Sequence, residues 1–209
     1  MDDSPKSQPY TPPDWDTMYR EGTPGWETGA PAGELVRTLD EGVVPIGRTL
    51  EIGCGTGADA VYLARRGFEV TGVDCSPLAV ERARSRAEMQ NAAVCFVLGD
   101  VFEFAETADP FDFVYDAGFY HFIREVNLSR YLDLLWRMTS PGSYCLTLAG
   151  RTGETAEGGP PQVSEEEIRS ELGRLFEFVH VRHFQFESPH RKGGYLGWSC
   201  LTQRPTTGG

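Results

Sequence analysis

The sequence predicts a single α/β domain with a Rossmann-like, doubly wound and mostly parallel seven-stranded sheet. Three observations predict it: short apolar runs alternate with helical segments, three glycines follow the first apolar run within five residues, and the chain ends in two long β-rich runs. The 209 residues suit one such domain. We expect a flexible tail at 1–13, rich in Pro, Ser, Asp and Gln, and one domain at 14–209. Within it we expect an aromatic lid and substrate segment at 14–46 and the core at 47–209.

The first elements follow the strand–helix order of a parallel sheet. A short helix at 34–41 places Leu35, Val36 and Leu39 on one face. After it come a strand at 48–52, a helix at 58–66 that Gly67 ends, a strand at 68–73, a helix that Ser76 and Pro77 begin and that runs to about 90, and a strand at 94–98.

The second half continues this order and then reverses direction. We expect a strand at 111–115, a helix at 127–138, a strand at 143–149, a flexible loop at 150–162, a helix begun by the capping box of Ser164 and Glu167, and an antiparallel hairpin of 176–186 and 195–203. The loop at 150–162 follows a strand on the ligand-binding edge and is a candidate lid. His190, Arg191 and Lys192 join the hairpin strands, either as a rim of an acceptor site or as a solvated charged turn.

Charge and composition restrict the class of partner. The formal net charge of -12 repels phosphate backbones, so we expect no nucleic-acid partner. No apolar run of about 18 residues and no basic, apolar leader occurs, so we expect a cytoplasmic protein without a membrane span. Five cysteines without a C-x-x-C pair predict reduced thiols and no zinc site.

The glycine-rich run after the first strand carries the functional prediction. Glu51, Gly53, Gly55 and Gly57 form E-x-G-x-G-x-G at a strand-to-helix turn. Glycines there let a ligand approach backbone N–H groups closely. A nicotinamide site has G-x-G-x-x-G spacing and binds pyrophosphate, which Glu51 would repel. The carboxylate favours a cationic ligand such as S-adenosylmethionine (SAM), whereas a tight turn without any ligand is the structural alternative.

The motif resembles the SAM-binding motif of class I methyltransferases, and the resemblance covers about residues 48–203. It implies that Asp74 at the end of the second strand binds the ribose hydroxyls, although an ordinary surface turn also explains Asp74 alone. It implies that Asp100 and Val101 form an adenine-binding corner. The expected cofactor-binding residues are Trp15, Tyr19, Glu51, Gly53, Cys54, Gly55, Gly57, Asp74, Cys75, Ser76, Asp100, Val101, Phe102 and Asp116. Cys54 and Cys75 suggest a metalloid acceptor, but small residues at tight turns explain them more simply.

The N-terminal segment resembles one branch of these enzymes. Trp15, Tyr19, Gly22 and Trp26, followed by Gly29 and Pro31, are similar to the segment that closes over SAM in the thiopurine S-methyltransferase and halide/thiol methyltransferase-like branch. The resemblance implies that Trp15 and Tyr19 lie near the cofactor and Trp26 near the acceptor. Alternatively, these aromatics only anchor a loop on the core.

The residues after the fourth strand depart from the thiopurine enzymes. Those enzymes carry Asp-Arg there, whereas this chain has Asp116-Ala117, so thiopurine specificity is not expected. The expected acceptor residues are Trp26, Ala117, Phe119, Tyr120 and His121, within an aromatic run that Phe122 completes. His121 is a candidate general base or a hydrogen-bonding group for the acceptor, with a packing histidine as the alternative. Tyr19 and Tyr120 are further candidate catalytic groups.

These interpretations predict an enzyme that transfers a methyl group from SAM to a small-molecule acceptor and releases S-adenosylhomocysteine (SAH), without a metal. A dry aromatic pocket favours a thiol, a sulfide or another soft nucleophile. An O- or N-methyltransferase of natural-product metabolism and a non-catalytic SAM-binding sensor are the alternatives. We expect a monomer or a homodimer.

Overall fold

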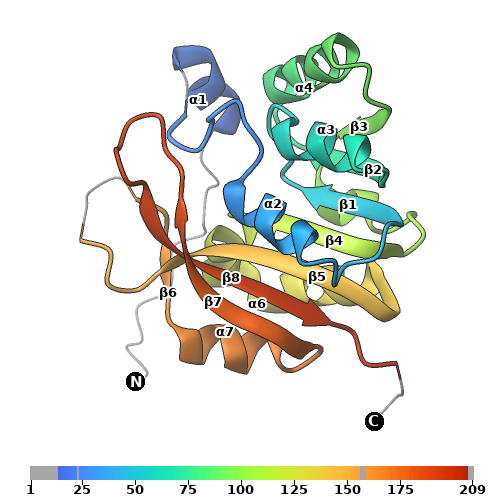
Figure 1. Ribbon diagram of the computed structural model, residues 1–209, viewed down its shortest axis with the longest axis vertical. Coiled ribbons are helices and arrows are strands. Elements are labelled where there is room, and N and C mark those ends of the chain that lie inside the picture. The colour runs from blue at the N-terminus through green and yellow to red at the C-terminus, as the bar shows by residue number, and fades with distance from the viewer. Residues whose placement is uncertain (1–13, 23, 156–158, 207–209) are drawn as a thin grey trace, which may run out of the picture.

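The computed structural model of the protein describes residues 14–22, 24–155 and 159–206, and the expected tail at 1–13 lies outside them (Figure 1). Its strands are β1 (Arg48–Ile52), β2 (Glu69–Asp74), β3 (Val94–Leu98), β4 (Phe111–Ala117), β5 (Thr139–Arg151), β6 (Gln162–Val163), β7 (Glu177–Phe186) and β8 (Tyr195–Gln203). Its helices are α1 (Trp15–Glu21), α2 (Gly33–Asp40), α3 (Ala58–Arg65), α4 (Pro77–Met89), α5 (Val101–Phe104), α6 (Phe119–Arg137) and α7 (Glu165–Leu172).

The strands form one sheet in the order β3-β2-β1-β4-β5-β8-β7, and the short β6 pairs with the end of β5. Strands β1 to β5 run parallel to one another, while β8 is antiparallel to both β5 and β7. The predicted doubly wound sheet with a terminal antiparallel hairpin is therefore confirmed, and the short β6 makes eight strands where seven were predicted. Because the chain moves outward from β1 to β3 and then returns to β4, the strand order reverses between β1 and β4, where such sheets bind ligands.

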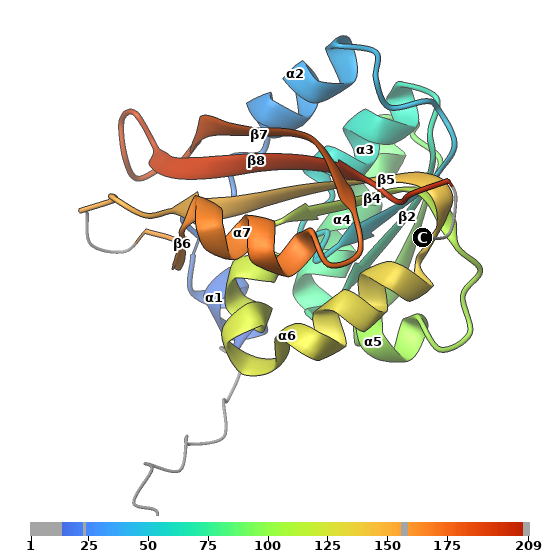
Figure 2. The same ribbon diagram turned by 90° about the horizontal axis from the view of Figure 1, so that it is seen from below.

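Helices cover both faces of the sheet. Figure 2 shows α5, α6 and α7 on one side and α2 and α3 on the other. Alternate strand residues point to opposite faces, so Leu50 and Ile52 pack with the α6 and α7 side, whereas Phe113 and Tyr115 pack with the α2, α3 and α4 side. Both apolar layers are buried, so the strands are packed on both faces and the residues at their ends are held in fixed positions.

Helix α6 begins eight residues earlier than the predicted helix at 127–138. Asp116 explains the early start, because its carboxylate accepts hydrogen bonds from the N–H groups of Phe119 and Tyr120. The backbone at Asn127 is non-helical (φ -160°, ψ 76°), and its side chain accepts from the Arg130 N–H. The predicted helix start at Asn127 thus coincides with a kink inside α6, where one helical segment meets the next.

Further elements, α5 among them, were not predicted or were given other bounds. Helix α1 forms inside the aromatic segment, where Asp14 caps it by accepting from the Thr17 N–H at 3.0 Å. Strand β5 extends to Arg151, and β6 forms at the end of the expected loop at 150–162. The capping box of Ser164 and Glu167 is present at the start of α7, as predicted. Among the described residues, no helix is both long and apolar enough to cross a membrane.

Candidate active site

The glycine-rich loop after β1 lies at the strand-order reversal. Gly53, Gly55 and Gly57 all have positive φ, between +51° and +76°, which a residue with a Cβ adopts only with strain. The N–H groups of Gly53 and Cys54 donate to the Val73 carbonyl at 2.9 and 3.1 Å. These bonds tie the loop to β2 and hold its shape without any ligand.

Glu51 is the buried acid of this motif. Its side chain is only 4% exposed, and its Oε2 has no hydrogen-bond partner. Burial raises its pKa well above the usual value, and the carboxylates of Asp59 and Asp74 raise it further. A cationic group beside Glu51 would relieve both the missing partner and the repulsion. The geometry therefore fits the α-ammonium of a SAM molecule.

Asp74 ends β2 beside the loop. Its Oδ2 accepts from the Gly55 N–H and its Oδ1 from the Ser76 N–H, each at 2.8 Å. Ser76 is buried and caps α4 by accepting from the Ala79 N–H, and the neighbouring Cys75 is exposed. The structure thus brings Glu51, the glycine loop, Asp74 and Cys75 together, as a cofactor site requires.

The predicted adenine corner follows β3. Asp100 caps α5 by accepting from the Phe102 N–H at 2.8 Å, and the Arg130 guanidinium lies 3.9 Å from the Phe102 ring centroid. Val101 is 6% exposed and belongs to the core. The corner therefore offers one half-exposed carboxylate and one aromatic ring at the edge of the sheet.

The N-terminal segment crosses the glycine loop. We call the described part of residues 14–32 the strap. The Tyr19 side chain is 4% exposed, and its hydroxyl lies 2.8 Å from where a Cβ on Gly55 would be. That hydroxyl accepts from Trp26 Nε1 at 3.1 Å, and burial raises the Tyr19 pKa. Only a glycine leaves room for this contact.

A chain of aromatic rings extends from the strap to the terminal hairpin, and we call it the aromatic wall. Trp26 lies 5.6 Å from Trp15, Trp15 lies 5.2 Å from Phe122, and Phe122 lies 4.8 Å from His121, measured between ring centroids. Phe186 at the end of β7 completes it, 6.4 Å from His121. Three separate segments therefore contribute to one apolar surface beyond the glycine loop.

His121 is the titratable member of the aromatic wall. Its side chain is 3% exposed, and burial lowers its pKa to about 3. Its Nδ1 accepts from the Gly150 N–H at 3.1 Å. A neutral imidazole with an accepting Nδ1 carries its proton on Nε2, so the Nε2 edge of the ring is a hydrogen-bond donor. That edge lies next to Gly118, where a Cβ would come 3.5 Å from Nε2.

Other predicted site residues have different partners. The Tyr120 hydroxyl donates to Glu171 at 2.6 Å on the α7 side of α6, and Phe119 lies against Phe102 and Tyr131. Asp116 is 1% exposed and accepts from two α6 N–H groups and the Tyr131 hydroxyl; burial raises its pKa to about 6. Ala117 is exposed at the end of β4. Tyr120 and Asp116 thus form hydrogen bonds within the fold, and their expected roles, Tyr120 at the acceptor and Asp116 at the cofactor, stay predictions.

The tip of the terminal hairpin lies near the strap. A Cβ on Gly25 would come 3.8 Å from the His190 ring, and Arg191 forms an ion pair with Glu154 at 3.0 Å. Lys192 is exposed. The strap and Glu154 therefore both lie against the hairpin tip, and a role of His190, Arg191 and Lys192 at the rim of an acceptor site stays a prediction.

Sequence reasoning missed several residues of this site. Asp59, on the first turn of α3, accepts from the Ala32 N–H and the Tyr115 hydroxyl, and burial raises its pKa to about 6. An acid two residues after Gly57, at the start of the helix that follows the glycine loop, could have been predicted from the sequence to lie near Glu51. Phe186 and Glu27 gave no such signal, because their contacts are with residues distant in sequence. Among the described residues, no group of three or more His, Cys, Asp or Glu side chains is arranged to hold a metal ion.

Comparisons with known proteins agree with this geometry. The family model for thiopurine S-methyltransferase (TPMT) matches residues 10–206. The chain is 29% identical to a probable thiol methyltransferase 2 of Arabidopsis thaliana over 181 residues, which are 86% of this chain and 80% of the relative. It is 30% identical to a 2-heptyl-1-hydroxyquinolin-4(1H)-one methyltransferase of Mycobacteroides abscessus over 156 residues, which are 73% of this chain and 68% of the relative.

Solved structures share the fold. A structure from work on the conversion of a disulfide bond into a thioacetal group during echinomycin biosynthesis has a TM-score of 0.80 at 24% identity and covers 92% of both chains. The SAH complex of the N-methyltransferase NodS from Bradyrhizobium japonicum WM9 has a TM-score of 0.65 at 21% identity, over 82% of this chain and 84% of NodS. With the family model matching nearly its whole length, the chain belongs to the thiopurine S-methyltransferase family and is a class I methyltransferase that uses SAM as its methyl donor.

Proposed function

We propose that this enzyme methylates a small, soft nucleophile, such as a thiol or sulfide, that reaches the aromatic wall as an anion. The observation that carries the proposal is the neutral His121 within that wall, with Nδ1 occupied by the Gly150 N–H. Its lone pair is engaged and its pKa is about 3, so His121 is a poor base at neutral pH. Of the two roles expected for it, the geometry supports the hydrogen-bonding one.

The proposed roles divide between two groups of residues. Glu51, Asp74 and the loop of Gly53, Gly55 and Gly57 hold SAM, which supplies a methyl group on a positively charged sulfur. Trp15, Trp26 and Phe122 exclude water, which leaves a soft anion less solvated and more reactive. The Nε2–H of His121 orients the acceptor by donating a hydrogen bond to it.

Relatives support this acceptor class and also suggest a second one. The chain resembles a probable thiol methyltransferase and, at 28% identity over 185 residues, a thiocyanate methyltransferase 1, both of Arabidopsis thaliana. The relative that acts on 2-heptyl-1-hydroxyquinolin-4(1H)-one favours an aromatic N-hydroxy compound as the second candidate. An apolar wall of aromatic rings suits either acceptor, so an assay has to separate them.

The test is SAH formation by the purified full chain with SAM and a panel of sulfide, two thiols of different pKa and 2-heptyl-1-hydroxyquinolin-4(1H)-one. We expect kcat/KM for each thiol to rise with pH and level off near that thiol's own pKa. His121→Ala should lower kcat/KM at every pH without changing this shape. An inflection shared by both thiols that disappears in His121→Ala would instead support a base. Turnover of the N-hydroxy compound alone would favour the second candidate.

A further inference from the structure

Two acidic residues of the strap contact the two segments that donate hydrogen bonds to Asp74, namely the glycine loop after β1 and the start of α4 after β2. Asp16 on α1 accepts from the Ser76 hydroxyl at 2.8 Å and from the Leu78 N–H at 3.0 Å. Glu27 accepts from the Thr56 hydroxyl in the glycine loop and lies 3.5 Å from Arg86 Nη2. Each carboxylate thus reaches from the strap to a segment that follows a strand of the parallel sheet.

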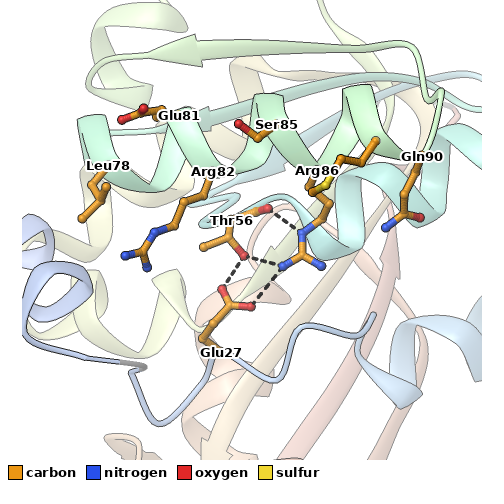
Figure 3. A pocket seen from close by; sticks show the side chains of 9 residues that line it. Glu27, Thr56, Leu78, Glu81, Arg82, Ser85, Arg86 and Gln90 are labelled. Carbon is orange, nitrogen blue, oxygen red and sulfur yellow. Dashed lines mark hydrogen bonds and ion pairs between the residues drawn. The ribbon is translucent and has the colours of Figure 1, made fainter.

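Arg86 on α4 strengthens the second contact (Figure 3). Its Nε donates to the Thr56 carbonyl at 2.9 Å, its Nη2 to the Thr56 hydroxyl at 3.1 Å, and its Nη1 to the Gly29 carbonyl at 2.8 Å. Figure 3 shows Thr56, Arg86 and Glu27 as one cluster, in which the Glu27 carboxylate reaches both the Thr56 hydroxyl and the Arg86 guanidinium. Thr56 is 4% exposed, so both its hydroxyl and its carbonyl are held in a part-buried network.

The segments that these carboxylates hold are the ones that fix Asp74. Asp74 Oδ1 accepts from the N–H of Ser76, whose hydroxyl Asp16 binds. Asp74 Oδ2 accepts from the N–H of Gly55, which precedes the Thr56 that Glu27 binds. Both oxygens of Asp74 are therefore oriented by donors that the strap holds in place.

We propose that Asp16 and Glu27 are positioning residues that couple closure of the strap to the orientation of Asp74. When the strap is closed, the two N–H donors are fixed and Asp74 is presented to the ligand in one conformation. When the strap opens, both anchors are lost together and cofactor binding weakens. By linkage, bound cofactor must stabilise the closed strap by the same factor. The inference rests on the proposed contact of Asp74 with the cofactor and concerns the cofactor side alone.

The experiment measures SAH affinity by calorimetry on the full chain, so it does not depend on the acceptor. The variants are Asp16→Asn, Glu27→Gln and Asp74→Asn, and the combinations of each strap variant with Asp74→Asn. Glu165→Gln is the matched control, because Glu165 pairs with Arg169 on α7, outside the strap and the glycine loop. Thermal unfolding without ligand is recorded for every variant to separate folding effects from binding effects.

We expect Asp16→Asn and Glu27→Gln each to weaken SAH binding about 5- to 20-fold, within the range of coupling between linked sites. In the Asp74→Asn background, neither change should weaken binding further. Amide hydrogen exchange of α1 should slow on SAH binding in the unsubstituted protein and much less in Glu27→Gln.

An Asp74→Asn variant that binds SAH normally would refute the role of Asp74. Strap variants that match Glu165→Gln, or whose losses add fully to that of Asp74→Asn, would refute the positioning. If a strap variant does not fold, amide hydrogen exchange of α1 in the unsubstituted protein still tests the coupling. Exchange that SAH does not slow would refute it.

Discussion

Replacement of Glu51 by Gln should make the ligand-free protein more stable and its cofactor binding weaker. The change keeps the side-chain size and the oxygen that accepts from the Ala60 N–H, but removes the charge. Glu51 is 4% exposed with an unpartnered Oε2, and the carboxylates of Asp59 and Asp74 repel it. This side chain therefore lowers stability when no cation lies beside it.

The sign of the pH dependence follows from the raised pKa. A carboxyl whose pKa is raised in the folded state is protonated in both states below its ordinary pKa of 4.5, so its charge then costs no stability. As the pH rises from there towards the folded-state pKa, the unfolded state ionises first and the folded state loses stability. At about pH 8, Glu51→Gln should raise the free energy of unfolding by about 1–3 kcal/mol, because the amide carries no charge for burial and the neighbouring carboxylates to destabilise, and each unit of pKa shift is worth about 1.4 kcal/mol. For a chain of this size that is a rise in Tm of about 2–4 °C per kcal/mol, and at about pH 4 the gain should vanish.

SAH affinity should change in the opposite direction. Loss of a hydrogen bond to a charged group costs about 1.5–3 kcal/mol, or about 10- to 150-fold in Kd. In the unsubstituted protein, affinity should fall as the pH drops through the raised pKa of Glu51, because the protonated form does not attract the ammonium; the variant should lack this dependence. Thermal unfolding and calorimetry across pH measure both effects, with Glu69→Gln, an exposed glutamate at the start of β2, as the control. A variant that is less stable at high pH, or that binds SAH with unchanged affinity, would refute the reasoning.

Three further changes have defined outcomes. Gly55→Ala should weaken SAH binding at least 10-fold, because the Cβ would meet the Tyr19 hydroxyl, whereas Gly42→Ala, also at positive φ but with open space around it, should lose only about 1 kcal/mol of stability. Tyr131→Phe removes one of the donors to the buried Asp116 and should lower the free energy of unfolding by about 1–3 kcal/mol in denaturant titration. Ser164→Ala breaks the capping box of α7 and should cost about 0.5–2 kcal/mol in thermal unfolding, without any effect on SAH affinity.

The cofactor side of the site was largely predictable because its signals are local. Each strand of the parallel sheet lies in a short stretch rich in apolar residues; the glycine turn directly follows the first of these strands, and Asp74 ends the second. Capping residues such as Ser76 and Ser164 mark helix starts within four residues of chain. The parallel direction of the strands, and a ligand site at their carboxyl ends, then follow from the alternation of strands and helices.

Elements that depend on distant partners were missed or misplaced. Helix α1 is anchored by Asp16 on Ser76, 60 residues away, and no local apolar pattern marks that contact. The early start of α6 was missed although its cause is local: Asp116 accepts from the N–H groups of Phe119 and Tyr120, three and four residues further on, but its place at the end of a strand favoured a role in ligand binding over one in starting a helix. Helical geometry also separates neighbours: Tyr120 faces Glu171 on α7, while His121 faces Phe186 on β7.

This difference explains why the acceptor is harder to infer than the cofactor. The glycine loop and Asp74 come from one stretch of about 25 residues, so a single local motif describes the proposed SAM site. The aromatic wall takes Trp15 and Trp26 from the strap, Phe122 from α6 and Phe186 from β7, so its shape depends on how these distant segments pack together. Substitution at any of them can alter the acceptor without disturbing the sheet or the glycine loop. Relatives that share the cofactor motif can therefore differ in acceptor. Acceptor preference should move from one such enzyme to another when three residues are exchanged together, Trp26, Phe122 and Phe186, rather than one at a time.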